Sequence, residues 1–165
     1  MKKNSVFYGL LAAFVAFIVA LDQWTKWLVE EKLAIGEDLP SILGIFHITR
    51  TTNAGSAWGM LSGHTWLFIL VMLLFIGLLV FIVWKKWLTK RFEILCLASV
   101  LGGGLGNMID RLFKNGLVTD MICTDFMEFP VFNVADCFIS VGCIALAVYV
   151  LFFDRDKKSQ KEQTQ

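Results

Sequence analysis

The sequence predicts an all-α membrane protein with four transmembrane helices and short β-strands in its first outer loop. Of its 165 residues, 57% are hydrophobic and only 18% are charged, whereas soluble domains are about 45–50% apolar and about 25% charged. The mean hydropathy is +0.68, and a soluble fold of this length has too little interior to bury so much apolar surface. The composition also excludes a disordered chain, a collagen-like fibre and a disulfide-rich secreted module. We therefore expect one integral-membrane domain over residues 1–165.

Four apolar stretches are long enough to cross the hydrocarbon core, which takes about 20 residues of helix. The first is uncharged over residues 4–21 and stays apolar beyond two charged positions. It follows Lys2 and Lys3, as a signal peptide would, but its length and the lack of a small-residue cleavage site predict a retained helix. The predicted spans cover residues 5–29, 65–84, 92–112 and 131–153, and a polar, disordered cytoplasmic tail is expected over residues 154–165.

The distribution of positive charge predicts how the chain is oriented. Of the 15 Lys and Arg residues, 10 lie at the N-terminus, between the second and third spans, or after the fourth span. Cytoplasmic segments are enriched in Lys and Arg, so both termini are expected in the cytoplasm and loops 30–64 and 113–130 outside. Residues 41–52 (SILGIFHITRTT) are rich in β-branched and aromatic types, which predicts short strands at the outer membrane surface.

A few ionisable residues lie within the apolar spans, where a charge costs roughly 2.5–3.5 kcal/mol at the helix centre. Such residues are functional by default. All of them fall near the outer ends of the first, third and fourth spans: Asp22, Lys26, Asp110, Arg111 and Asp136. Their clustering predicts a functional site at the outer membrane face.

Structural explanations stay open beside this functional one. Asp22 and Lys26 lie four residues apart and can neutralise each other on one helix face. Asn133 and Asp136 are placed as an N-cap and a first-turn acid of the fourth span.

The third span has structural explanations of its own. Asn107 and Arg111 are four residues apart on one helix face, and Arg111 can extend to the membrane interface. Gly102 and Gly106 have the spacing of closely packed helices.

The acidic residues predict a specific chemistry. Two carboxylates held close together cannot both ionise, so they share a proton. The ionised one can take a proton from an attacking water while the protonated one hydrogen-bonds the carbonyl oxygen of a peptide bond. Asp136 needs such a partner from the adjacent outer segment, and Asp120 and Asp125 are the candidates, with Asp110 a weaker one. The pattern therefore predicts an aspartic protease that cuts just outside the bilayer.

Other chemistries have less support. Ser56 lacks the surroundings of a serine nucleophile, and His47 and His64 are isolated and interpreted as loop or interfacial residues. No phosphate-binding glycine loop is present, and a net charge of +1 offers no basis for nucleic-acid binding. The four cysteines have no metal-ligand spacing and are interpreted as small buried hydrophobic residues: Cys96, Cys123, Cys137 and Cys143.

Five segments, in order and at similar spacing, resemble the motifs of the lipoprotein signal peptidases (signal peptidase II). They are DQWTK (22–26), NAGSAWG (53–59), GGLGNMIDR (103–111), VTDMI (118–122) and FNVAD (132–136). The resemblance covers nearly the whole chain and is specific, although each segment alone is a weak signal. Two details differ from the family pattern: the interval from Arg111 to Asp120 is one residue longer, and Cys123 stands where the family often has Asp. Asp125 therefore stays an alternative partner of Asp136.

The resemblance implies a multi-pass aspartic endopeptidase of the bacterial inner membrane, with four helices and a small extracytoplasmic β cradle. Its site faces outward and cleaves signal peptides from diacylglyceryl-modified prolipoproteins. It further implies no metal or other cofactor, inhibition by globomycin, and a monomer whose partners are the prolipoprotein and membrane lipid. Asp120 and Asp136 match the catalytic pair. The implied supporting or substrate-binding residues are Asp22, Lys26, Asn53, Gly55, Ala57, Gly103, Asn107, Arg111, Asn133 and Ala135.

The main alternative of another class is a proton- or ion-coupled carrier, because intramembrane acids also serve as relays. A carrier predicts ionisable residues across the depth of the membrane and often an internal repeat, and the sequence has neither pattern. A protease of the GxGD type is also disfavoured, since residues 104–107 (GLGN) end in Asn where that motif needs Asp.

Overall fold

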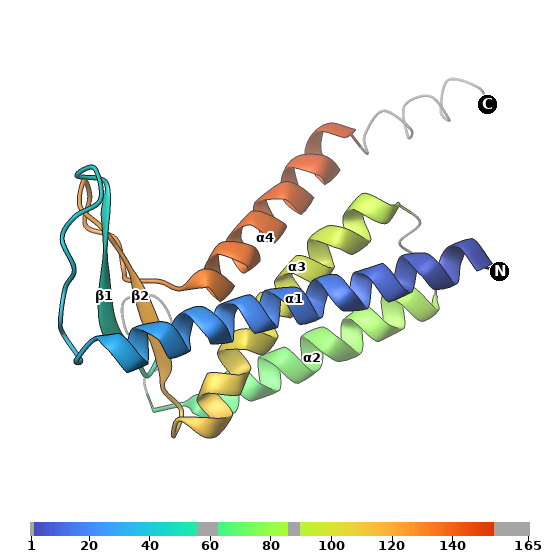
Figure 1. Cartoon of the computed structure of the whole chain (residues 1–165). Coiled ribbons are helices and arrows are strands. Elements are labelled where there is room, and N and C mark those ends of the chain that lie inside the picture. Colours follow the sequence, from blue (N-terminus) through green and yellow to red (C-terminus); the bar gives the residue numbers. More distant parts are fainter. Residues whose placement is uncertain (1, 56–62, 86–89, 154–165) are drawn as a thin grey trace.

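The computed structural model describes residues 2–55, 63–85 and 90–153, and within them the chain forms four helices and two strands (Figure 1). All four helices are long and apolar enough to cross a membrane, so the predicted fold class is confirmed. In chain order the elements are α1 (Lys2–Lys32), β1 (Phe46–Asn53), α2 (Thr65–Trp84), α3 (Arg91–Phe113), β2 (Val118–Thr124) and α4 (Val134–Phe153).

Helix α3 is the centre of the bundle, packing most extensively against α4 and then α1, and more lightly against α2. Glycines make these contacts close. A Cβ atom at Gly102 would lie 2.9 Å from the Ile18 Cβ of α1, and one at Gly142 would lie 2.8 Å from the Cys96 carbonyl oxygen. The close packing predicted from the glycine spacing of α3 is therefore confirmed.

The two strands form an antiparallel sheet, paired from Phe46 with Thr124 to Asn53 with Val118. A register shift interrupts the pairing between Ile48 and Thr51. A strand in the first outer loop was predicted, but β2 was not, because the sequence analysis assigned no structure to this part of the second outer loop. The sheet thus joins the α1–α2 connection to the α3–α4 connection, and residues far apart in sequence meet on it.

Helix α4 begins at Val134 rather than at residue 131, where its span was predicted to start. The preceding Phe132 pairs with Ile122 of β2 through backbone hydrogen bonds in both directions, of 2.8 and 3.1 Å. These bonds hold residue 132 in an extended conformation, so the helix cannot include it. The α4 N-terminus is thereby fixed against the sheet.

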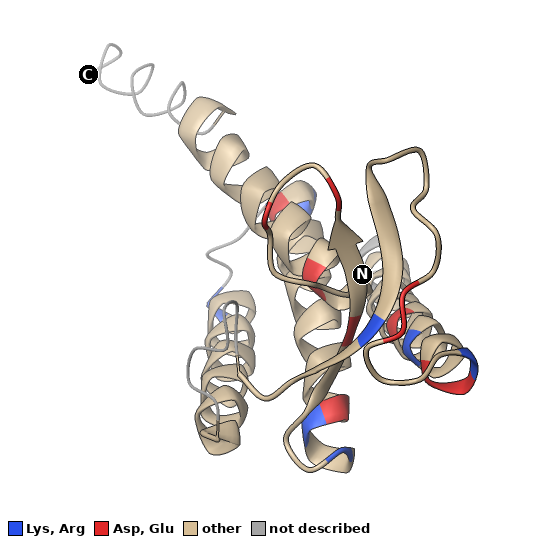
Figure 2. Cartoon of the chain, turned by 90° about the vertical axis from the view of Figure 1, so that its left-hand side faces the viewer, with Lys and Arg blue, Asp and Glu red and all other residues tan. Residues whose placement is uncertain are grey.

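The far end of α1 also reaches the sheet. It continues past the predicted end at residue 29 to Lys32, and Val29 and Leu33 pack against Met121 of β2. The N-terminal end of α1 and the C-terminal end of α4 point away from the sheet (Figure 1). Seen from the sheet end, charged residues lie on the strands, loops and adjoining helix ends, while most of the helical ribbon is uncharged (Figure 2). The predicted tail 154–165 lies outside the described residues.

The prediction of buried cysteines holds only for Cys96. Cys123 and Cys137 are half-buried and Cys143 is exposed, and all four are free thiols. Cys143 lies next to Gly142, which faces α3, so its own side chain points away from the other helices. An apolar residue on a membrane helix needs no burial inside the protein when it faces lipid.

Candidate active site

A cavity of about 780 Å³ lies between the sheet and the ends of α2, α3 and α4 that are nearest to it. Most of its wall is apolar and comes from α2, α3 and α4, including Phe68, Met72, Phe75, Val100 and Ile139. Its lining includes six of the predicted site residues: Asn53, Gly55, Asn107, Arg111, Asp120 and Asp136. The structure therefore brings both predicted catalytic aspartates to one cavity.

Asp120 is held in place by β2 and is almost completely buried, with 2% of its surface exposed. Its Oδ1 accepts a hydrogen bond from Asn133 Nδ2 at 2.6 Å, and its Oδ2 accepts one from Asn53 Nδ2 at 3.1 Å. The pKa of Asp120 is raised to about 6. Burial is the main cause and the nearby charge of Asp136 adds to it, while the hydrogen bonds from the two amides and the charge of Lys26 oppose the rise. This carboxyl group can hold a proton near neutral pH.

Asp136 lies in the first turn of α4. Its Oδ1 accepts from Asn107 Nδ2 at 2.8 Å, and its Oδ2 accepts from the Asn133 backbone N–H at 3.2 Å. In return its own backbone N–H donates to Asn133 Oδ1 at 3.0 Å. The N-cap interpretation is confirmed, and it is compatible with a second role because the same Asn133 contacts Asp120.

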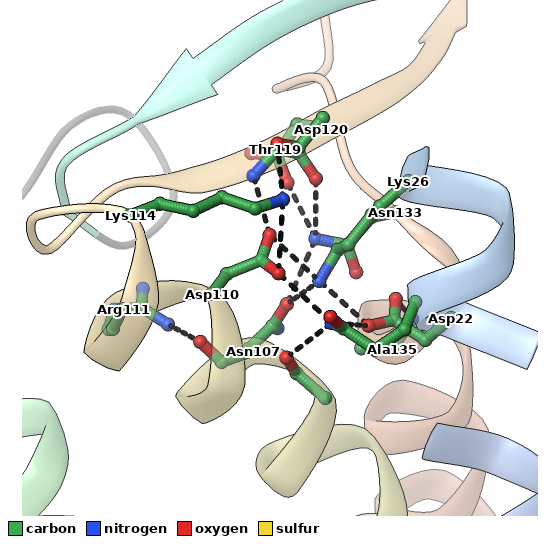
Figure 3. A network of polar contacts seen from close by, with 12 residues as sticks. Asp22, Lys26, Asn107, Asp110, Arg111, Lys114, Thr119, Asp120, Asn133 and Ala135 are labelled. Carbon is green, nitrogen blue, oxygen red and sulfur yellow. Dashed lines mark hydrogen bonds and ion pairs between the residues drawn. The ribbon is translucent and has the colours of Figure 1, made fainter. Parts of the chain in front are cut away.

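Behind the cavity, a buried ionic network connects α1 to α3 and α4 (Figure 3). Lys26 is 1% exposed and lies 2.8 Å from Asp22 Oδ2 and 3.5 Å from Asp110 Oδ2. Asp22 Oδ1 accepts the backbone N–H of Ala135 at 2.9 Å. The predicted neutral pair is thus confirmed, but it extends to two further helices. The network fixes α1, α3 and α4 relative to one another beside the first turn of α4, which contains Asp136.

The network continues to the sheet through Asp110, which the sequence analysis placed at the site, and through three residues that it missed: Glu30, Lys114 and Thr119. Asp110 Oδ2 accepts the Thr119 backbone N–H at 3.0 Å, and Lys114 lies 3.3 Å from Asp110 Oδ1. Glu30 accepts from both Lys114 and the Thr119 hydroxyl. Asp110 thus holds β2 one residue before Asp120. Asp110 and Thr119 lie in the segments 103–111 and 118–122 that resemble family motifs, and this position was the sequence signal for them. Glu30 and Lys114 lie outside the five segments, so no sequence signal pointed to them.

Arg111 points into the cavity rather than along the helix to the membrane interface. One guanidinium nitrogen donates to the Gly55 carbonyl oxygen at 2.8 Å, and the group lies 4.2 Å from the centre of the Phe68 ring. Gly55 in turn donates its N–H to Asn53 Oδ1 at 2.8 Å. Arg111 therefore connects α3 to the end of β1 and orients the residues beside Asp120.

Asp125, the alternative partner of Asp136, lies at the far end of the sheet and does not line this cavity. It accepts a hydrogen bond from Ser41 and lies 2.6 Å from His47 Nδ1. These two contacts hold the pKa of Asp125 below its usual range. His47 belongs to β1 and also lies 3.7 Å from Asp38, so it is part of a cluster and not isolated as the sequence suggested.

Two predicted supporting residues complete the picture. Gly103 lies on α3 directly against Ala135, where a Cβ atom would meet the Ala135 carbonyl oxygen at 2.4 Å. Ala57 lies outside the described residues. No signal in the uniformly apolar α2 identified Phe68 and Met72 as cavity residues.

We expect Asn133→Ala to lower both stability and cleavage. Losing an N-cap costs about 0.5–2 kcal/mol of unfolding free energy, and buried Asp120 loses its 2.6 Å donor. Asn133→Ser is the matched variant, because a Ser can still cap α4 but is too short to reach Asp120. Thermal unfolding in detergent should place Asn133→Ser above Asn133→Ala, while both lose activity. A fully active Asn133→Ser would contradict a role of Asn133 at Asp120.

Comparison with known proteins gives concordant matches. A family model described as signal peptidase (SPase) II matches residues 14–152. A lipoprotein signal peptidase of Geobacillus thermodenitrificans is 41% identical over 160 residues, covering 96% of this chain and 98% of the relative. One of Listeria monocytogenes is 40% identical over 146 residues, covering 87% and 94%.

Two solved structures of bacterial membrane enzymes, determined by the in meso method, are also similar. The first has a TM-score of 0.83 and 32% identity, and the match covers 91% of this chain and 92% of that one. The second has a TM-score of 0.79 and 31% identity, and the match covers 88% and 94%.

Proposed function

Because this chain belongs to the signal peptidase II family, whose members are proteases, we propose that it removes signal peptides from diacylglyceryl-modified prolipoproteins. The proposed site is the cavity that contains Asp120 and Asp136. The single observation that carries this proposal is that these two carboxylates, from β2 and α4, line one cavity and are bridged by Asn133. Four helices that are long and apolar enough to cross a membrane support the proposal, because a lipid-modified substrate lies in a membrane.

We place the site at the outer face of the bacterial inner membrane, with both termini in the cytoplasm. The clustering of Lys and Arg at the termini and between α2 and α3 supports this orientation. The N-terminal end of α1 and the C-terminal end of α4 lie opposite the sheet (Figure 1), as the proposal requires. We further propose that the chain acts as a monomer, because one chain supplies both carboxyl groups and the three amides that hydrogen-bond to them.

The reaction follows from a pair of carboxyl groups that share one proton. The ionised Asp136 takes a proton from water as the water oxygen attacks the scissile carbonyl carbon, and protonated Asp120 gives its proton to the carbonyl oxygen. The resulting tetrahedral diol then breaks its C–N bond as protonated Asp136 gives its proton to the leaving amine nitrogen and ionised Asp120 takes a proton from one diol hydroxyl. The products are a carboxyl end on the signal peptide and a free amino end on the lipid-modified cysteine.

The lining of the cavity suits a lipid-linked substrate. Apolar side chains of α2, α3 and α4 form one wall, and the carboxylates lie at its sheet end. A diacylglyceryl group buried among apolar side chains would hold the scissile bond at the membrane surface, next to the two carboxylates. We propose that membrane lipid fills the same apolar wall when no substrate is bound.

We expect cleavage to decline on the alkaline side of about pH 6. The protonated form of Asp120 is required, and its pKa is raised to about 6, so the protonated fraction falls about tenfold per unit above that pH. The apparent value belongs to the pair of carboxyl groups. Measuring kcat/KM from about pH 5 to about pH 8 tests this, and a rate that keeps rising across the range would contradict it.

The proposed function is tested with purified protein in lipid and two forms of one prolipoprotein, with and without the diacylglyceryl group. We expect the modified form to be cleaved at the bond before its cysteine and the unmodified form to be cleaved far more slowly. If neither form is cleaved, the assignment of the substrate is wrong.

A further inference from the structure

Lys26 contacts neither proposed catalytic carboxyl group, yet it contacts a residue that does. Its Nζ donates to Asn107 Oδ1 at 2.9 Å, and Asn107 Nδ2 donates to Asp136 Oδ1 at 2.8 Å. Among the described residues that line the cavity, Asn107 and Asp136 are present and Lys26 is not. The side chain of Asn107 therefore lies between Lys26 and Asp136.

The contact fixes the direction of the Asn107 amide. An ammonium group has three donors and no acceptor, so it requires the oxygen of Asn107 to face it. Asn133 Nδ2 also donates to this oxygen, at 3.0 Å. If the amide turned over, its N–H groups would face two donors and its oxygen would face the carboxylate oxygen of Asp136. The orientation that places N–H on Asp136 is therefore held from behind.

The other two amides of the site are held in the same sense, but by backbone groups. Asn133 Oδ1 accepts the N–H of Asp136 at 3.0 Å, and Asn53 Oδ1 accepts the N–H of Gly55 at 2.8 Å. Each then presents its Nδ2 to Asp120. The contact made by Lys26 differs because its donor belongs to a side chain, which a substitution can remove.

The charge of Lys26 is balanced, as its burial demands. Asp22 and Asp110, both 0% exposed, lie 2.8 and 3.5 Å from its ammonium nitrogen. The charged groups around the catalytic pair are Asp22 and Lys26 of α1 and Asp110 and Arg111 of α3. Burying an ammonium group costs free energy even when carboxylates surround it. If Lys26 served only to neutralise Asp22 and Asp110, its ammonium group would not need to contact Asn107.

We propose that Lys26 is a positioning residue that keeps the N–H group of Asn107 on Asp136 and so keeps Asp136 ionised and ready to accept a proton from water. This inference rests on the proposed function. A carboxylate that accepts an N–H hydrogen bond keeps its charge to lower pH, whereas one that faces an amide oxygen favours its protonated form. Without Lys26, the acidic limb of the pH–rate profile moves to higher pH.

The test is the pH–rate profile of Asp22→Asn/Lys26→Met, which removes one positive and one negative charge together. We expect its acidic limb to move up by about one pH unit, so that kcat/KM falls about tenfold below the limb. Lys32→Met, an exposed lysine at the end of the same helix, is the matched control and should follow the wild type. Lys26→Arg keeps donors toward Asn107, so its limb should stay at the wild-type position even where the rate falls.

Repeating the double substitution in a variant that lacks the Asn107 amide separates an effect of Lys26 through Asn107 from a direct effect of its charge on Asp136. In Asn107→Ala, the same double substitution should move the acidic limb little, because the group it orients is absent. An equal shift in both backgrounds, or an unshifted limb in folded Asp22→Asn/Lys26→Met, overturns the inference. If the double variant does not fold, Lys26→Gln replaces it, with a smaller upward shift expected and an unchanged limb counting against the inference.

Failure of this inference and failure of the proposed function give different results. When the wild type cleaves modified prolipoprotein and the limb does not move, only the role of Lys26 is wrong. When the wild type cleaves nothing, the proposed function is wrong and this inference falls with it.

Discussion

Replacing Asp136 with Asn, or Asp120 with Asn, is expected to reduce cleavage of modified prolipoprotein by a factor of about 10³ to 10⁴. Removing a positioned acid or base costs about 10²–10⁴ in rate, and here either substitution also removes the shared proton. Asn has the same shape as Asp, so this substitution disturbs the positions of the contacting Asn133 and Asn107 side chains less than other substitutions would. The measurement is kcat/KM with purified variants, with thermal unfolding in detergent to show that each variant is folded.

Asp125→Asn is the matched control for this pair. Asp125 lies at the far end of the sheet with Ser41 and His47, so its removal should change kcat/KM by no more than about twofold, as for a surface substitution away from the site. If Asp120→Asn still cleaves and Asp125→Asn does not, Asp125 is the partner of Asp136 in the working enzyme. If all three variants cleave, the protease does not use these carboxylates.

The position of the site was predictable because charge is costly inside a membrane. Asp22, Lys26 and Asp110 stood out in apolar spans, and each is now part of one buried network at the sheet end of the helices. The membrane leaves few ways to bury such groups, since each needs a partner. Because all three residues lie near the same end of their predicted spans, the sequence predicted that they would lie close together.

The partner of Asp136 was not predictable from spacing alone. Asp120 and Asp125 both lie in the connection between α3 and α4, and such a connection can present either residue to Asp136. Strand pairing decides between them, because β2 places Asp120 opposite Thr51 and brings Asp125 close to His47 instead. That pairing joins residues about 70 positions apart, and no local pattern determines which strands meet.

The apolar wall of the cavity was invisible for a different reason. Helix α2 contains only uncharged residues from Thr65 to Trp84, so every face of it suits lipid equally well and the sequence carries no contrast between faces. Met72 is buried on it because Gly104 of α3 leaves room, with a Cβ at Gly104 placed 2.8 Å from the Met72 sulfur. The sequence feature that accompanies the burial of Met72 is Gly104 on the neighbouring helix, and a glycine does not indicate which residue will pack against it.

Gly103→Ala is expected to have the largest effect on stability of any substitution that adds a single methyl group to α3. The new Cβ would lie 2.4 Å from the Ala135 carbonyl oxygen and 2.8 Å from Ile139 Cγ1. The oxygen belongs to the backbone and cannot rotate away, so α3 and α4 must separate. Overpacking of this kind typically costs about 1–3 kcal/mol. Because Ala135 immediately precedes Asp136, cleavage should also fall, by at least about tenfold.

Gly77→Ala provides the matched control, because it adds the same methyl group to a membrane helix where nothing lies within 4 Å. Ala favours a helix over Gly by about 1 kcal/mol, so Gly77→Ala should unfold at or above the wild-type temperature in detergent and keep its activity. Gly103→Ala should unfold well below both. Equal unfolding temperatures together with full activity in both variants would mean that α3 and α4 are not in close contact at Gly103. Loss of cleavage without loss of stability in Gly103→Ala would instead mean that the helices separate only enough to displace Asp136 from Asp120.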